Sequence, residues 1–180
     1  MKILKKIVFV FLTITFMGSC MNNVGFSQID DLTIDPVYNI SLIYFNLNQT
    51  DFIENGIELD TIVDVTNFTI FDKYPVIRKN LTKLEATINI NNKFNRNFNV
   101  QFDFLDTNNI IVYSFQEFLI SANNQTFTQT EVIDIETTPQ FLTTKKMKIT
   151  VILLPSSTPL DPFDMVTLNF QSAGKFYLNF

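Results

Sequence analysis

Carboxylates are the side chains of this sequence whose spacing could support acid–base or metal chemistry. Two carboxylates can act as acid and base on a glycosidic bond, and aspartate-rich turns can supply oxygen ligands to Ca²⁺. No calcium loop with a closing glutamate is complete, and no cluster has a catalytic context that we recognise. We therefore interpret the clusters as turn-forming or solvated side chains, and expect no catalytic, metal or cofactor site. The clusters are Asp30-Asp31 with Asp35, Glu58-Asp60-Asp64, and the two calcium candidates Asp103-Asp106 and Asp161-Asp164.

The composition excludes most other catalytic chemistry. The chain contains no histidine, which excludes Ser-His and Cys-His nucleophilic sites, most zinc sites and the commonest general base. The four glycines stand apart at positions 18, 25, 56 and 174, so the chain has no glycine-rich phosphate loop. We therefore expect a protein that is not an enzyme, and keep a carboxylate-based hydrolase as a remote alternative.

Cys20, the only cysteine, closes a segment with the three parts of an export signal. Three lysines provide the positive start, residues 7–17 are apolar apart from two threonines, and the small residues Gly18 and Ser19 precede the cysteine. The apolar run of 11 residues is too short to cross a hydrocarbon core of roughly 30 Å. We therefore expect cleavage between Ser19 and Cys20 rather than a retained transmembrane helix.

The segment Phe16-Met17-Gly18-Ser19-Cys20 resembles the lipobox of bacterial lipoproteins, with Met17 in place of the usual leucine. The resemblance implies that Cys20 is lipidated on sulfur and acylated on its new amino group. One acyl chain binds a membrane only marginally, so two or three chains are needed for a stable anchor. We expect residues 1–19 to be a signal peptide, 20–34 a flexible tether and 35–180 one folded domain.

The residues after Cys20 suggest where the anchor is held. An aspartate in that position usually marks inner-membrane retention in such lipoproteins, and Met21 and Asn22 are not that signal. An acid-rich stretch, typical of surface display, is also missing directly after the cysteine. The resemblance therefore implies the outer membrane, with the periplasmic leaflet favoured over the cell surface. Without the signal lysines the chain has 10 basic and 18 acidic residues, so we exclude nucleic acid as a partner.

Alternation of apolar and polar residues dominates from residue 35 and predicts an all-β fold, a single antiparallel immunoglobulin-like sandwich of about seven to nine strands. The clearest strand is 84–91, and 98–104 forms a hairpin with 110–119 around the turn at Asp106 to Asn109. Further predicted strands are 38–45, 61–71, 127–135, 147–154, 166–170 and 175–180, with a turn at 123–124, short helices at 51–54 and 139–143, and a rigid loop at 155–162.

The 20 phenylalanines allow two interpretations. Most fall at alternating strand positions, which favours core packing, but they could also line a lipid or glycan cleft. The ending Phe176 to Phe180 resembles the closing strand of outer-membrane barrels, and a small barrel is a further alternative. Short strands, polar loops and the absence of tryptophan weigh against it.

Residues 84–98, followed by Phe102-Asp103-Phe104-Leu105-Asp106 and a turn, carry a family resemblance. A strand ending in an Asn-Lys-Phe corner and a strand ending in Leu-Asp resemble short outer-membrane lipoproteins of Bacteroidota, of the flavobacterial type. They resemble more distantly the water-stress domain of late-embryogenesis-abundant proteins, a β-sandwich. Asp60-Thr61-Ile62 also resembles O-glycosylation sites of Bacteroidota periplasmic proteins, although Thr61 could simply begin a strand.

These observations predict a non-enzymatic interaction module, attached to the membrane through its N-terminal lipid and docking on an envelope protein. Edge strands or the loop at 155–162 would supply the contact. The alternative is a glycan- or lipid-binding protein with a phenylalanine-lined cleft.

Overall fold

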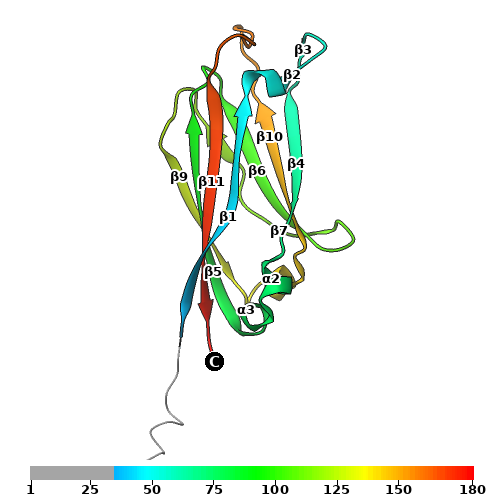
Figure 1. Cartoon of the computed structure of the whole chain (residues 1–180), viewed down its shortest axis with the longest axis vertical. Helices are drawn as coiled ribbons and strands as arrows, with labels where there is room; N and C mark the ends of the chain where they lie inside the picture. Colours follow the sequence, from blue (N-terminus) through cyan, green and yellow to red (C-terminus); the bar gives the residue numbers. More distant parts are fainter. Residues whose placement is uncertain (1–34) are drawn as a thin grey trace, which may run out of the picture. The chain divides into compact units, whose positions relative to one another are not determined.

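Two antiparallel sheets packed against each other make up residues 35–180, the part of the chain that this computed structural model describes (Figure 1). Each sheet has open edges and neither is closed into a barrel. The all-β sandwich predicted from the sequence is therefore confirmed. The four-stranded sheet has the strand order β1 (Val37–Asn48), β11 (Thr167–Leu178), β5 (Leu81–Asn92), β9 (Phe127–Asp134). The five-stranded sheet has the order β4 (Thr61–Asn67), β10 (Lys146–Leu153), β6 (Phe98–Leu105), β7 (Ile111–Ser114). Its fifth strand, β8 (Phe118–Ile120), also pairs with β6.

Most strands and turns lie where the pattern predicts them. The predicted turn between β6 and β7 is held by Asp106, whose Oδ1 accepts hydrogen bonds from the N–H groups of Asn108 (2.7 Å) and Ile110 (2.9 Å). Asn109 in this turn and Asn123 in the second predicted turn adopt the left-handed conformation, with φ of 61° and 58°. Asparagine tolerates this region better than other residues with a side chain, so both turn predictions are confirmed.

The two C-terminal strands predicted at 166–170 and 175–180 are one strand, β11. The predicted break rests on the small and polar residues between them. In the structure Ser172 and Gly174 face the core, while Gln171 and Ala173 face outward, so the alternation continues without interruption. The small side chains at Ser172 and Gly174 therefore allow close packing in the core and do not mark a turn.

The predicted strand 61–71 is wrong beyond Asn67, where β4 ends and two short helices follow, α2 (Ile70–Lys73) and α3 (Pro75–Asn80). Phe68 and Phe71 are both buried, and residues three apart reach the same side only when the chain turns helically. The predicted strand 110–119 is likewise divided into β7 and β8.

Phenylalanine fills the space between the sheets. Among residues 35–180, nine of the twelve largest fully buried side chains are phenylalanines, so core packing explains most of their abundance. Phe104 of β6 has no exposed surface and lies 5.0 Å from the ring of Phe141 and 5.2 Å from that of Phe115, both edge-on. A second aromatic group, Phe94 and Phe98, packs at the other end of the sandwich with rings 5.3 Å apart.

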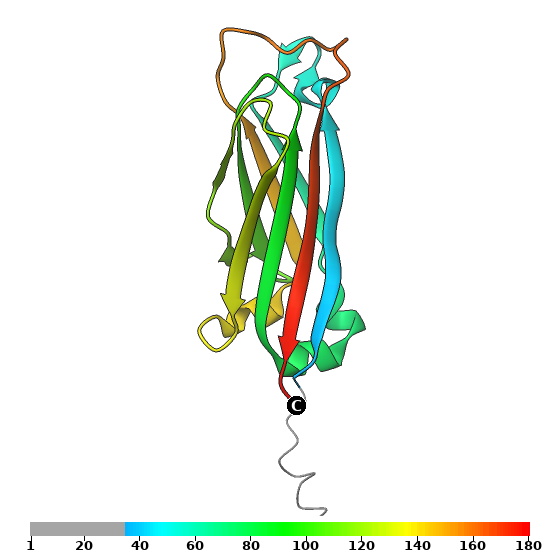
Figure 2. The same cartoon turned by 90° about the vertical axis from the view of Figure 1, so that its left-hand side faces the viewer.

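The sandwich has two structurally different ends (Figures 1 and 2). At the proximal end the chain enters β1 and leaves β11, since the N–H of Leu178 donates to the carbonyl of Pro36 (3.1 Å). This end also carries α2, α3 and the 3₁₀ helix η4 (Pro139–Thr143). Of these three helices, the sequence predicted only η4. The distal end carries the 3₁₀ helix η3 (Gln49–Phe52), the small hairpin β2 (Ile53–Glu54) and β3 (Ile57–Glu58), and residues 154–166, named here the distal loop. Within residues 35–180, no helix is long and apolar enough to cross a membrane.

Gly174 provides a test of this packing. A Cβ at this position would lie 2.8 Å from the Phe176 ring and 2.9 Å from a Leu84 methyl, both fully buried. Overpacking of this kind costs about 1–3 kcal/mol. We expect Gly174→Ala to lower the unfolding midpoint in urea, followed by circular dichroism. The control is Ala173→Ser on the exposed side of the same strand, which should change stability by less than about 0.5 kcal/mol. Equal midpoints for the two variants would contradict this account of β11.

Candidate interaction surface at the distal end

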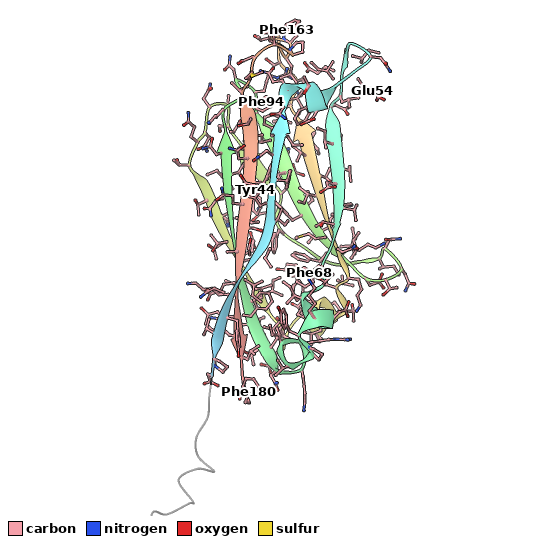
Figure 3. All side chains as sticks on the ribbon, viewed as in Figure 1. Tyr44, Glu54, Phe68, Phe94, Phe163 and Phe180 are labelled. Carbon is pink, nitrogen blue, oxygen red and sulfur yellow. The ribbon has the colours of Figure 1, made fainter. Side chains whose placement is uncertain are left out.

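The distal loop exposes large apolar side chains. Phe163 is 90% exposed and Met165 is 96% exposed, and Figure 3 shows Phe163 at the tip of the distal end, beyond the ends of the strands. Ile57, in the neighbouring β2–β3 hairpin, is 68% exposed. A single exposed apolar residue is ordinary. Several large ones on adjoining segments at one end of a domain are a typical feature of an interaction site.

Arg96 fixes this loop to the rest of the domain. Its side chain is only 4% exposed and binds Glu58 with both terminal nitrogens, Nη2 to Oε1 at 2.9 Å and Nη1 to Oε2 at 3.2 Å. The same nitrogens donate to two carbonyls of the distal loop, those of Leu154 (2.8 Å) and Thr158 (3.0 Å). Bidentate charge-assisted bonds are among the stronger hydrogen bonds in proteins. Arg96 therefore joins the β2–β3 hairpin and the distal loop at one point, and we name these bonds the Arg96 clamp.

Glu58 receives a further bond in the clamp. The backbone N–H of Leu160 donates to Glu58 Oε2 at 3.0 Å. The hydrogen bond from Arg96, and to a smaller extent that from Leu160, hold the pKa of Glu58 below its usual value against the effect of burial. The carboxylate therefore stays ionised and paired at neutral pH.

The remaining part of the loop is held by backbone hydrogen bonds. The N–H of Asp161 donates to Oε1 of the buried Gln49 at 2.8 Å. Asp161 Oδ1 in turn accepts from the N–H of Phe163 at 2.9 Å. Prolines at positions 155, 159 and 162 further restrict the backbone φ angle. They lower the conformational entropy that this segment has in the unfolded chain, so less entropy is lost when the loop becomes ordered. The loop is thus ordered by polar contacts that leave the side chains of Phe163 and Met165 outside.

The position of Arg96 depends on a buried asparagine. Asn92 has no exposed surface. Its Nδ2 donates to the carbonyls of Arg96 (2.9 Å) and Ser121 (2.8 Å), and its Oδ1 accepts from the N–H of Phe94 (2.9 Å). The Asn-Lys-Phe corner noted in the sequence is therefore a hydrogen-bonded bend that turns the guanidinium toward the distal loop.

The structure accounts for several residues singled out in the sequence. Ser19 and Cys20, and with them the predicted cleavage and lipidation, lie outside the described residues, as do Asp30 and Asp31. Thr61 is exposed at the first position of β4. The acidic cluster of Glu58, Asp60 and Asp64 does not act as a unit, because Glu58 belongs to the Arg96 clamp.

The two calcium candidates are engaged in other contacts. Asp103 is 5% exposed, forms an ion pair with Lys148 (2.8 Å) and accepts from Ser114 Oγ (2.7 Å). Burial alone would raise the pKa of Asp103, but Lys148 and Ser114 outweigh it and the pKa lies below its usual value. Asp106 and Asp161 cap turns. Among residues 35–180, no three His, Cys, Asp or Glu side chains are grouped so that they could hold a metal ion.

Open hollows lie elsewhere on the domain. A groove of about 390 Å³ runs between the edge strands β1 and β4, with Phe45, Leu47 and Ile62 in its lining and Asp51 and Asp64 beside them. Phe45 is stacked on Phe170 with ring centroids 4.3 Å apart. Two further hollows lie on the four-stranded sheet, one of about 640 Å³ at its proximal end near Lys83 and Tyr177 and one of about 340 Å³ nearer the distal end.

Comparison with known proteins gives only distant structural similarities. No protein-family model matches this chain, and no curated protein matches its sequence. A protein from Parabacteroides distasonis described as secreted shares 15% identity at a TM-score of 0.46 over 64% of this chain and 38% of that one. The VP2 subviral particle of infectious bursal disease virus shares 10% identity at 0.40, over 80% of this chain and 32% of that one. Desmodium yellow mottle tymovirus shares 13% at 0.39, over 83% and 89%.

This chain spans less than half the length of the first two of these proteins. At such identities and scores the similarities carry no argument about this protein.

The Arg96 clamp predicts how the distal loop depends on one side chain. In Arg96→Ala the loop loses its bonds at Leu154 and Thr158, and Glu58 loses its buried partner. Removing one partner of a buried pair costs about 3–5 kcal/mol, and we expect the lower end because Glu58 is 34% exposed. Amide hydrogen exchange in residues 154–166 should accelerate. Arg78→Ala, which removes an exposed arginine of α3, is the control, and equal exchange in both variants would exclude the clamp.

Proposed function

We propose that this protein is an outer-membrane lipoprotein of the Bacteroidota type whose domain docks, without catalysis, on another protein of the cell envelope. The lipobox resemblance around Cys20 supports the anchor. The observation that supports docking is the distal loop, where Phe163 and Met165 are almost fully exposed on a backbone held by the Arg96 clamp. The periplasmic leaflet remains part of the proposal.

The position of the loop suits a docking role. The chain enters the domain at the proximal end, beside the end of β11. β11 contains 12 residues, and a strand of this length spans about 40 Å at roughly 3.3 Å per residue. A lipid on Cys20 would thus be connected to the end of the domain opposite the distal loop. This arrangement leaves the apolar tip free to meet a partner.

The charge around the tip favours a protein over a lipid surface. Asp161 and Asp164 lie in the same loop as the two apolar side chains, and Glu54 in the adjoining hairpin. Acidic residues repel the anionic head groups that attract peripheral membrane proteins. A partner suited to this surface has an apolar pocket for Phe163 and Met165, bordered by lysine or arginine.

Order in the free loop supports useful affinity from a small contact. Binding costs free energy for every loop and side chain that it immobilises. Here the backbone around Phe163 is already restrained by Asp161 and by the prolines. Much of the entropy cost of ordering this loop is therefore met when the domain folds. Less of the free energy gained by burying Phe163 and Met165 is then lost to ordering the loop when a partner binds.

The anchor is tested by Cys20→Ala. We expect the variant to lose incorporation of labelled fatty acid and to move from the membrane fraction to the soluble fraction, because no thioether lipid can form. Ser27→Ala, in the same expected tether, is the control and should stay with the membrane. An unchanged membrane fraction and label in Cys20→Ala would remove the lipoprotein part of the proposal.

The docking surface is tested by Phe163→Ser/Met165→Ser. After crosslinking in cells and affinity purification, we expect the native protein to yield a reproducible envelope partner and the double variant to lose it. Phe180→Ser is a matched control, since Phe180 is 57% exposed at the proximal end (Figure 3). Exposed substitutions of this kind change stability by less than about 0.5 kcal/mol. Equal recovery of the partner with both variants, or recovery of the native protein alone, would overturn the docking surface.

A further inference from the structure

The outer face of the four-stranded sheet is divided by charge. Figure 2 shows this face toward the viewer, with β9, β5, β11 and β1 side by side. In its proximal half, the cross-strand neighbours Lys175 and Glu85 form one row, and Tyr177, Lys83 and Asp134 form the next. The paired rows of its distal half, named here the amide face, carry uncharged side chains, and the exposed Lys93 lies just beyond the end of β5. The outward side chains of the amide face are Asn46, Asn169 and Asn91 in one row, and Tyr44, Gln171, Asn89 and Thr128 in the next.

The amide face contains a hollow. A depression of about 340 Å³ is lined by Asn89, Asn91, Asn169 and Gln171 from the two central strands, together with Gln125, Thr126, Phe127 and Thr128 at the β9 side and Ile90 of β5. This volume lies in the lower part of the range of ~300–1,000 Å³ typical of small-ligand sites. The site is therefore large enough for a short oligomer and too open for a fully enclosed ligand.

The hydrogen-bonding groups of this hollow are partly unused. The Asn91 Oδ1 atom is buried and has no hydrogen-bond partner among the described residues. A buried acceptor without a donor is uncommon and carries a free-energy penalty, and a ligand hydroxyl relieves it only when the Asn91 amide rotates toward the hollow. Asn89 Oδ1 accepts from Thr128 Oγ1 at 2.8 Å, so this oxygen is already engaged and the N–H₂ group of Asn89 is the part of the amide left to donate to a ligand.

The chemistry of these groups defines the ligand class. Each amide presents a donor and an acceptor together, which suits hydroxyl groups that must both give and accept a hydrogen bond. Because the paired rows of the amide face have no charged side chain, they offer no counter-ion to a ligand that carries a phosphate, a carboxylate or an amine. Tyr44 of β1, 67% exposed in the same row as Gln171 and Asn89, adds an aromatic surface on which the C–H face of a sugar ring can pack. The strand spacing of ~4.8 Å is close to the length of one pyranose unit, so successive strands can address successive sugars.

We infer that the amide face is a binding site for a neutral oligosaccharide laid across β11, β5 and β9. This site is separate from the distal loop and differs from the phenylalanine-lined cleft considered from the sequence, because polar amide and hydroxyl side chains make up most of its lining and Phe127 is its one aromatic residue. An envelope lipoprotein with both surfaces would hold a protein at its tip and a glycan on its side.

The experiment uses the full chain in detergent micelles and isotope-labelled protein. The probes are neutral hexa-oligosaccharides of glucose, mannose, galactose, xylose and N-acetylglucosamine, with hexagalacturonate as the charged comparison. We expect at least one neutral probe to bind and to shift the side-chain amide NMR signals of Asn89, Asn91 and Gln171. Asn169→Ala/Gln171→Ala should weaken this binding at least tenfold. Lys175→Ala, on the charged half of the same strand, should leave it unchanged.

The outcomes separate the glycan site from the docking site. The variant Phe163→Ser/Met165→Ser should bind the oligosaccharide as the native protein does, so that loss of one activity leaves the other standing. No binding of any neutral probe, binding that survives Asn169→Ala/Gln171→Ala, or a preference for hexagalacturonate would each overturn the inference. The NMR measurement on the native protein decides the question even if the double variant fails to fold.

Discussion

Burial of aromatic rings between the two sheets is the interaction on which the rest of this domain depends. Phe104 is its centre, with Phe68, Tyr113, Phe115 and Phe141 around it at centroid distances of 5.0–6.2 Å. These rings come from the connection after β4, from β7 and the segment behind it, and from η4, so one side chain of β6 joins elements spread over much of the sequence. Aromatic pairs of this geometry contribute about 0.5–1.5 kcal/mol each beyond their buried area. The described residues contain no cysteine, and packing of this kind takes the place of disulfides.

The distal end follows a different principle, because it is ordered by polar contacts at the edge of this core. The Arg96 clamp satisfies two loop carbonyls and a carboxylate with one buried guanidinium. Buried charge is tolerated only when it is paired and hydrogen-bonded, and here the pairing partner sits in a separate hairpin. The result is a loop whose backbone is fixed while its largest side chains stay in solvent. Large apolar side chains held in solvent on an ordered backbone are a typical feature of an interaction site. We therefore assign the proposed function to this loop.

The two proposed surfaces differ in chemistry and in location, and they make different demands on the fold. The distal loop presents Phe163 and Met165 with acidic neighbours, which suits a protein pocket. The amide face presents neutral donors and acceptors on the outside of a sheet, which suits a polyol. The sheet provides a rigid, regular spacing of side chains for the second, whereas the loop provides protrusion for the first. Neither surface requires the other, and neither requires catalysis.

The sequence by itself determined where most of the strands lie and, in strands such as β5 and β6, which residues are buried, because alternation with a period of two is a local property that burial enforces residue by residue. It also determined the turns at Asp106 to Asn109 and at Asn123, since asparagine and aspartate act through their own backbone. Only the tertiary structure decided that β11 runs unbroken past Ser172 and Gly174, because that depends on the side chains of Leu84 and Phe176 packed above the glycine. It likewise decided the pairing of Arg96 with Glu58 and the gathering of amides on one half of one sheet. These contacts join residues from distant strands, and no local pattern records which distant segments the core will bring together.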